Sequence, residues 1–147
     1  MTIKSKKLFW ILSITWGLPM TLVGAVVYIA LRIVGYKTKK VGYATCFEVG
    51  DNWGGFSAGP VIVTCKNPGM SLLSHEHGHS INNCQLGPFM IIGSIASMAR
   101  YWYRELRYYR RGLTPPTAYD DFWFEALATK TGEEFFKTYN ENEVSIW

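Results

Sequence analysis

Ten residues near the middle of the chain, Leu72–Ile81 with the sequence LLSHEHGHSI, decide the fold because all three histidines fall within them. His75 and His79 are four residues apart, so on an α-helix they project from the same face. Two imidazoles placed in this way can bind one metal ion, and zinc accepts nitrogen, sulfur and oxygen ligands in a tetrahedral arrangement. The pattern therefore predicts a helix that carries part of a Zn²⁺ site.

The residues on either side of this stretch support the helix. Pro68-Gly69 ends the segment before it, and Ser71 or Ser74 can cap its first turn. Leu72-Leu73 and Ile81 offer an apolar face, as expected of a helix that holds buried ligands. The alternative is an ordinary helix with histidines on its surface.

Glu76 and His77 complete the H-E-x-x-H pattern. Glu76 leans to the side of the histidine face, where it could take a proton from a zinc-activated water as a general base. His77 points away from that face, so we expect it to be structural or to support a ligand by hydrogen bonding, and not to bind the metal itself.

A third ligand must come from outside this helix, because no histidine remains. The candidate residues are Glu125, Asp120, Asp121, Glu105 and Cys84. Glu125 is favoured because it lies in an apolar helix predicted over 119–136, where an isolated carboxylate would be costly without a partner. The alternative for Glu125 is a carboxylate on a helix surface, and Asp120 and Asp121 are expected to cap that helix.

The segment Leu8–Leu31 contains no charged residue over 24 positions and is flanked by lysines and Arg32. About 20 apolar residues suffice to cross a bilayer, so this segment predicts a transmembrane anchor kinked near Gly17 and Pro19. A cleaved signal peptide is the alternative, but the apolar run is long for one. The predicted domains are an anchor at 1–36 and a metal-binding domain at 37–147.

Two further segments point to a membrane. Phe89–Ala99 is short for a crossing and predicts a re-entrant, interfacial or core helix. After it, Arg100, Arg104, Arg107 and Arg111 follow helical spacing among Trp and Tyr, which predicts a cationic stripe at a lipid surface. A solvated helix face is the alternative. Anionic lipid is therefore the expected partner of this chain of net charge +4, and nucleic acid is not, because no recognised motif supports it.

A β-hairpin is predicted between the helices. Residues 42–49 and 60–65 are β-branched and aromatic, and they flank the turn-forming Gly50–Gly55. Cys46 and Cys65 could pair there, although three reduced thiols fit an odd cysteine count better.

The motif HEHGH, followed by Glu-x-x-Ala at Glu125–Ala128, resembles the membrane-bound gluzincin metallopeptidases, which include prenyl-protein peptidases and heat-shock membrane proteases. In that group the glutamate of Glu-x-x-Ala is the third zinc ligand; Thr129 stands where those families usually carry Asp. The segments Gly54–Pro60 and His75–Pro88 are similar to those of small bacterial membrane proteins with an HE-x-GH motif, a likeness that covers about half the chain. Site-2 proteases share HExxH, but their downstream Asp-Gly motif is absent.

The segments together predict a mainly α fold with a small β-hairpin, in which an N-terminal transmembrane helix precedes a compact zincin-like helical domain. The resemblance implies zinc and peptide hydrolysis, so we expect a membrane-anchored zinc metallopeptidase acting on peptide or protein substrates, with His75, His79 and Glu125 as ligands and Glu76 as base. Tyr119 or Tyr103 could donate to the transition state, and the lysines favour a cytoplasmic site at a bacterial membrane. The alternative function is a non-catalytic membrane protein with a structural metal site and an arginine-rich helix that binds lipid or a partner.

Overall fold

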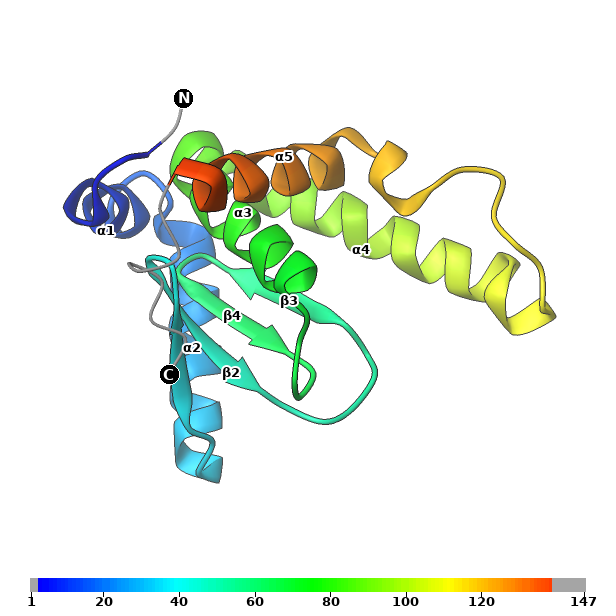
Figure 1. The fold of residues 1–147 in the computed structure, drawn as a ribbon, viewed down its shortest axis with the longest axis horizontal. Helices are drawn as coiled ribbons and strands as arrows, with labels where there is room; N and C mark the ends of the chain where they lie inside the picture. The colour runs from blue at the N-terminus through cyan, green and yellow to red at the C-terminus, as the bar shows by residue number, and fades with distance from the viewer. Residues whose placement is uncertain (1–2, 139–147) are drawn as a thin grey trace.

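The computed structural model describes residues 3–138, which are mainly helical with one small mixed sheet (Figure 1). In chain order the main elements are α1 (Lys6–Ile14), α2 (Leu18–Val34), β1 (Thr38–Val41), β2 (Ala44–Glu48), β3 (Gly55–Ala58), β4 (Val61–Thr64), α3 (Met70–Leu86), α4 (Phe89–Arg107) and α5 (Trp123–Thr138). Two short 3-10 helices, η1 (Tyr109–Arg111) and η2 (Tyr119–Asp121), lie between α4 and α5. The prediction of a mainly α fold with a small β element is confirmed.

The four strands lie in the order β1-β2-β4-β3. The pairs β1–β2 and β3–β4 are antiparallel, whereas β2 and β4 are parallel, with Thr45 opposite Val61. The predicted hairpin between residues 42–49 and 60–65 is therefore wrong. The turn formers after β2 lead into an extra strand, β3, and its reversal brings β4 alongside β2 in the same direction. Both central strands are almost fully buried, as parallel strands usually are.

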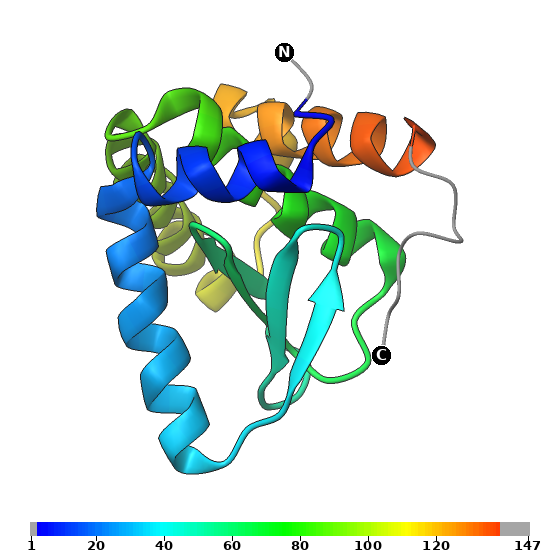
Figure 2. The same cartoon turned by 90° about the vertical axis from the view of Figure 1, so that its left-hand side faces the viewer.

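The charge-free segment predicted as a single transmembrane helix is broken into α1 and α2, whose axes are bent by 96° (Figure 2). Gly17 lies at the break, pressed against α3, because a Cβ there would be 2.4 Å from Nδ2 of Asn83. Pro19 falls in the first turn of α2, where its missing N–H removes no helical hydrogen bond. Among the described residues no single helix is long and apolar enough to span a membrane. The helices α1 and α2 are long and apolar enough only when they are taken together as one bent pair. The kink was predicted correctly and the single helix was not.

Both N-terminal helices pack on the rest of the chain. Phe9 of α1 is fully buried in a cluster with Tyr43, Ile81 and Phe135. Gly24 of α2 lies so close to the carbonyl of Ala58 that an added Cβ would be 2.1 Å from its oxygen. The expected division into domains at residue 36 stays a prediction.

The helices α3 and α5 lie side by side with their backbones in close approach (Figure 1). A Cβ on Gly78 would lie 1.9 Å from the carbonyl oxygen of Ala128, and one on Gly132 would lie 1.9 Å from that of Ser74. Small residues on both helices therefore permit the contact, and this contact brings the two halves of the candidate site together.

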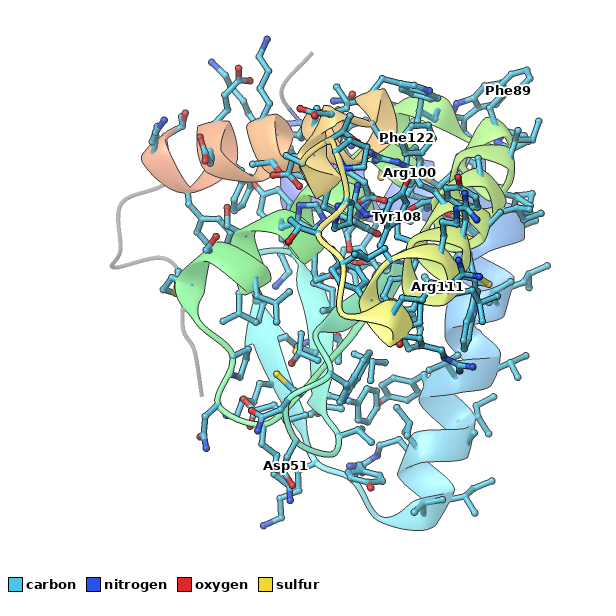
Figure 3. All side chains as sticks on the ribbon, turned by 90° about the vertical axis from the view of Figure 1, so that its right-hand side faces the viewer. Asp51, Phe89, Arg100, Tyr108, Arg111 and Phe122 are labelled. Atoms are coloured by element: carbon cyan, nitrogen blue, oxygen red, sulfur yellow. The ribbon has the colours of Figure 1, made fainter. Side chains whose placement is uncertain are left out.

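The two helices predicted over 89–111 are one continuous helix, α4, extended by η1. Its arginines do not form one outward stripe. Arg100 donates to the carbonyl of Tyr119 and the buried Arg104 donates to that of Thr117, so both turn inward and hold the segment before α5. In Figure 3 Arg100 lies beside Phe122, with Cζ 5.5 Å from the ring centroid. Arg107 and Arg111 are exposed, so the predicted stripe is wrong for its two inner members.

All three cysteines are free thiols, as the odd count favoured, and Cys46 and Cys65 form no disulfide. Burial raises the pKa of the Cys46 and Cys84 thiols, which keeps both protonated at neutral pH.

Candidate metal centre

His75 and His79 of α3 and Glu125 of α5 meet at one point between the two helices. Oε2 of Glu125 lies 3.0 Å from Nε2 of His75 and 3.2 Å from Nε2 of His79. Glu125 and His79 are buried and His75 is partly buried. The two histidines predicted from their spacing and the glutamate favoured from its apolar surroundings therefore come together, and this group could hold a metal ion.

The donor set suits a tetrahedral ion. Ligand atoms at zinc lie about 2.0–2.2 Å from the metal, which places them roughly 3.3 Å from one another. The three ligand atoms here lie within 4.8 Å of one another, so small side-chain rotations suffice to surround an ion. Two imidazoles and one carboxylate would leave a fourth position for water, as in catalytic zinc sites.

The three ligands are also coupled electrostatically. Burial disfavours the charge of Glu125, but hydrogen bonds from His75 and His79 outweigh burial and hold the pKa of this carboxyl well below its usual range. For His75 burial favours the neutral ring, yet the hydrogen bond to Glu125 and the charge of Glu76 raise its pKa. A cation would replace the histidine protons as the partner of the carboxylate, so metal and protons compete for this site.

Glu76 is buried between α3 and the edge strand β3. Oγ of Ser57 lies 2.7 Å from Oε2 of Glu76 and 2.7 Å from its backbone oxygen, and the single hydroxyl proton serves one of them at a time. Burial raises the pKa of Glu76, against the opposing charges of His79 and His75 and the hydrogen bond from Ser57. A carboxylate whose pKa is raised is a stronger base than an ordinary one, and Glu76 is the residue next to His75 on α3.

The second oxygen of Glu125 is held from α4. Ser97 donates a short hydrogen bond to Oε1 of Glu125, and the hydroxyl of Tyr119 lies 3.3 Å from Oγ of Ser97. The Tyr119 hydroxyl is therefore connected to Glu125 through Ser97, and burial raises the pKa of Tyr119, which keeps the phenol protonated as a donor. Tyr103, the other tyrosine considered, is 58% exposed and packs against Tyr108, away from this group.

His75 is held from behind by α5. Its Nδ1 lies 2.9 Å from Oγ1 of Thr129, whose hydroxyl donates to Oδ2 of Asp120 at 3.3 Å. Asp120, expected as a helix cap, instead accepts from this threonine. His79 lacks such support, because its buried Nδ1 has no hydrogen-bond partner among residues 3–138.

The remaining candidates lie elsewhere. Asp121 accepts from the backbone N–H of Ala118 and so caps η2, Glu105 approaches Arg110, and Cys84 contacts Ser13 and the carbonyl of Phe9. His77 lies away from the metal group, as predicted, and accepts a hydrogen bond from the N–H of Tyr43. The expected serine cap of α3 is wrong: the helix begins after Gly69 with no side-chain cap.

A pocket of about 330 Å³ opens beside the centre, between the start of α3 and the end of α5. His75 and Thr129 line it together with the apolar side chains of Met70 and Phe136.

Sequence reasoning missed Ser57 and Ser97, which orient the two key carboxylates. Their hydrogen bonds join positions 19 and 28 residues apart, and nothing in the local sequence distinguishes these serines from others. Thr129 could have been found, since it follows Glu125 by four residues and so shares its helix face.

No known protein-family model, curated protein or solved structure matches this chain.

Proposed function

We propose that the protein is a zinc-dependent metallopeptidase, in which His75, His79 and Glu125 hold Zn²⁺. The observation that carries the proposal is the convergence of these three ligand atoms within 4.8 Å, with the buried Glu76 on the same helix as the two histidines. Zinc would polarise a scissile carbonyl and lower the pKa of water to about 7. Zinc is the proposed metal because the donors are nitrogen and oxygen atoms and because three ligands leave a fourth position open.

The protein's own groups divide the remaining work. Glu76 takes the proton of the attacking water, and the hydroxyl of Ser57 holds its carboxylate against β3. Ser97 fixes one oxygen of Glu125 and leaves the other for the metal. Tyr119, whose hydroxyl lies 3.3 Å from Oγ of Ser97 and whose pKa is raised by burial, donates a hydrogen bond to the negative charge that develops on the substrate.

The test combines zinc content with hydrolysis of a quenched fluorescent peptide library by purified protein. We expect about one zinc per chain in the wild type and in Glu76→Gln, and none in His79→Ala. Glu76→Gln should lower kcat by at least about 100-fold, because the loss of a general base costs that much or more. Lys130→Gln, an exposed change on α5, serves as the matched control and should leave both readouts unchanged.

The other candidate function is a non-catalytic protein with a structural metal site. It would give one zinc per chain and no hydrolysis by either the wild type or Glu76→Gln. A wild-type protein that binds no zinc after incubation with Zn²⁺ at neutral pH would refute both functions.

A further inference from the structure

The two faces of α4 are reversed relative to those of a helix on a water-soluble surface. Its buried side carries Met90, Gly93, Ser97 and Arg104, of which two are polar or charged. Its exposed side is apolar and aromatic, with side chains 46–65% exposed: Phe89, Ile92, Ile95, Met98, Tyr101, Trp102, Tyr103 and Leu106. Water favours the opposite arrangement, so this outer face is matched to an apolar environment.

The outer face of helix α2 is apolar as well, although its inner side chains Val27 and Leu31 are also apolar. Gly24 is its one buried residue, and its large exposed side chains are Leu18, Leu22, Val23, Val26, Tyr28, Ile29, Ile33 and Val34. Figures 2 and 3 show α2 and α4 along the same side of the molecule, and the two helices are in contact. The exposed side chains of α2 and α4 are together called here the apolar face.

Positive charge lies at the ends of this face. Exposed basic residues there are Arg32 and Lys37 at the end of α2, and Arg107, Arg110 and Arg111 at the end of α4. No Asp or Glu occurs before Glu48. A second copy of this chain would bring the same positive charges against them, whereas anionic headgroups would complement them.

The geometry points to an anionic phospholipid membrane as the occupant of the apolar face. The side chains of α2 and α4 enter the boundary between headgroups and acyl chains, and the basic ends contact the phosphates. Tyr28 and Trp102 suit that boundary, since each has an apolar body and a polar tip. This binding mode differs from a helix that crosses the bilayer, and it places the metal centre directly behind α4, through Ser97.

The test is flotation with vesicles of phosphatidylcholine alone or mixed with phosphatidylglycerol, after the protein is exchanged out of detergent. We expect the wild type to float with the mixed vesicles. Ile29→Asp and Ile95→Asp, at positions 58% and 61% exposed, should each weaken partitioning about tenfold or more, because each removes a large apolar side chain from the lipid. Met70→Asp, at a position on α3 that is 50% exposed and lies outside the apolar face, is the control and should float as the wild type does.

Unchanged flotation of both aspartate variants, or no flotation of the wild type, would overturn the inference. So would a wild-type dimer that these variants make monomeric without any loss of lipid binding, since a second copy would then cover the face. The zinc-site variant His79→Ala should float normally, so this result stands apart from the fate of the proposed catalysis.

A second, independent observation concerns how His75 is oriented. For Nε2 of His75 to bind a metal, Nδ1 must carry the ring proton. That proton can be donated to Oγ1 of Thr129 at 2.9 Å, and the threonine hydroxyl in turn donates to Asp120 at 3.3 Å. Both hydrogen bonds are then donated in the same direction, away from His75 and toward the carboxylate of Asp120.

We infer that Thr129 and Asp120 are positioning residues that fix the tautomer and ring angle of His75 through this relay, an inference that rests on the proposed metal site. Metal-bound histidines are commonly held by a carboxylate directly. In this site the carboxylate of Asp120 acts through the hydroxyl of Thr129, which lies one helical turn after Glu125 on α5. His79, whose Nδ1 has no partner in the described part of the chain, depends on packing against Phe124 instead.

Zinc affinity measured by chelator competition tests the relay without any activity assay. Thr129→Val should weaken zinc binding about 10–100-fold, Thr129→Ser should restore it to within about threefold, and Asp120→Asn should fall between them. Thr138→Val is the matched control on the same helix, since within residues 3–138 that hydroxyl donates only to the backbone carbonyl of Glu134. Unfolding midpoints without metal should agree among these variants.

Zinc binding by Thr129→Val equal to that of a zinc-binding wild type would overturn the relay alone. A wild type without zinc affinity would overturn the relay together with the metal site, so the two failures are distinct.

Discussion

His77 is the one histidine that takes no part in the metal group, and it lies in the interior. Its ring is fully buried among the rings of Phe9, Tyr43 and Phe135. Nε2 accepts the N–H of Tyr43, so a neutral ring carries its proton on Nδ1, which has no hydrogen-bond partner within residues 3–138. Burial lowers the pKa of His77 to about 3. This residue therefore stays neutral in the folded protein at any physiological pH.

The burial of His77 makes stability depend on pH. Its pKa is about 6.5 in the unfolded chain and about 3 in the folded one, so between these values the unfolded chain binds one more proton. The free energy of unfolding should therefore fall as the pH falls through this window, by about 1.4 kcal/mol per pH unit from this group. Denaturant titrations at pH 6.5, 5.5 and 4.5 measure it, with His77→Gln as the comparison. An equal pH slope in the two proteins would show that His77 is not the cause.

At the scale of secondary-structure elements, the close packing of α3 against α5 depends on two glycines. Neither Gly78 nor Gly132 is needed for a left-handed backbone, since both lie inside helices. Their role is to leave room, because each faces a carbonyl of the partner helix at a distance that excludes a methyl group. The helix pair in turn fixes the distance from Glu125 to both histidines.

Gly78→Ala should force the two helices apart. Its Cβ would meet the oxygen of Ala128 at 1.9 Å, and that oxygen is backbone, which cannot rotate away. We expect a loss of about 1–3 kcal/mol in the free energy of unfolding and weaker zinc binding, measured by thermal unfolding with and without Zn²⁺. Gly69→Ala is the control: it precedes the same helix at φ −68°, with nothing within 4 Å. Similar effects of the two substitutions would contradict the close approach.

At the scale of the whole molecule, the N-terminal helix α1 contributes a side chain to the hydrophobic core. Phe9 is fully buried, while Ile11, two residues later on α1, is 46% exposed. Phe9 also contacts the rings of Tyr43 and His77, which belong to the sheet connection and to α3. Helix α1 thus packs against the element that carries the metal ligands.

Phe9→Ala should lower the free energy of unfolding by about 3–5 kcal/mol, since it removes a large side chain and leaves a cavity. Ile11→Ala on the same helix should cost less than about 1 kcal/mol, because its side chain remains half in solvent. Guanidinium titrations of both variants measure the difference. Equal losses would mean that α1 behaves as a separate anchor that does not support the core.

The candidate ligands could be predicted from the sequence because their signals are local. Four-residue spacing places His75 and His79 on one face of any α-helix. An isolated glutamate in an apolar helix is costly to bury without a partner, whichever element the helix packs against. This argument favoured Glu125. The break near Gly17 and Pro19 follows from backbone chemistry in the same way.

The tertiary structure alone decided how these pieces meet. The parallel pairing of β2 with β4 depends on where β3 reverses, and the inward turn of Arg100 and Arg104 depends on carbonyls 13–19 residues further along the chain. Ser57, Ser97 and Asp120 gain their roles only from contacts across the fold. Periodicity and composition report which face of an element is apolar, but hydrogen bonds between distant residues form only once packing has brought those residues together.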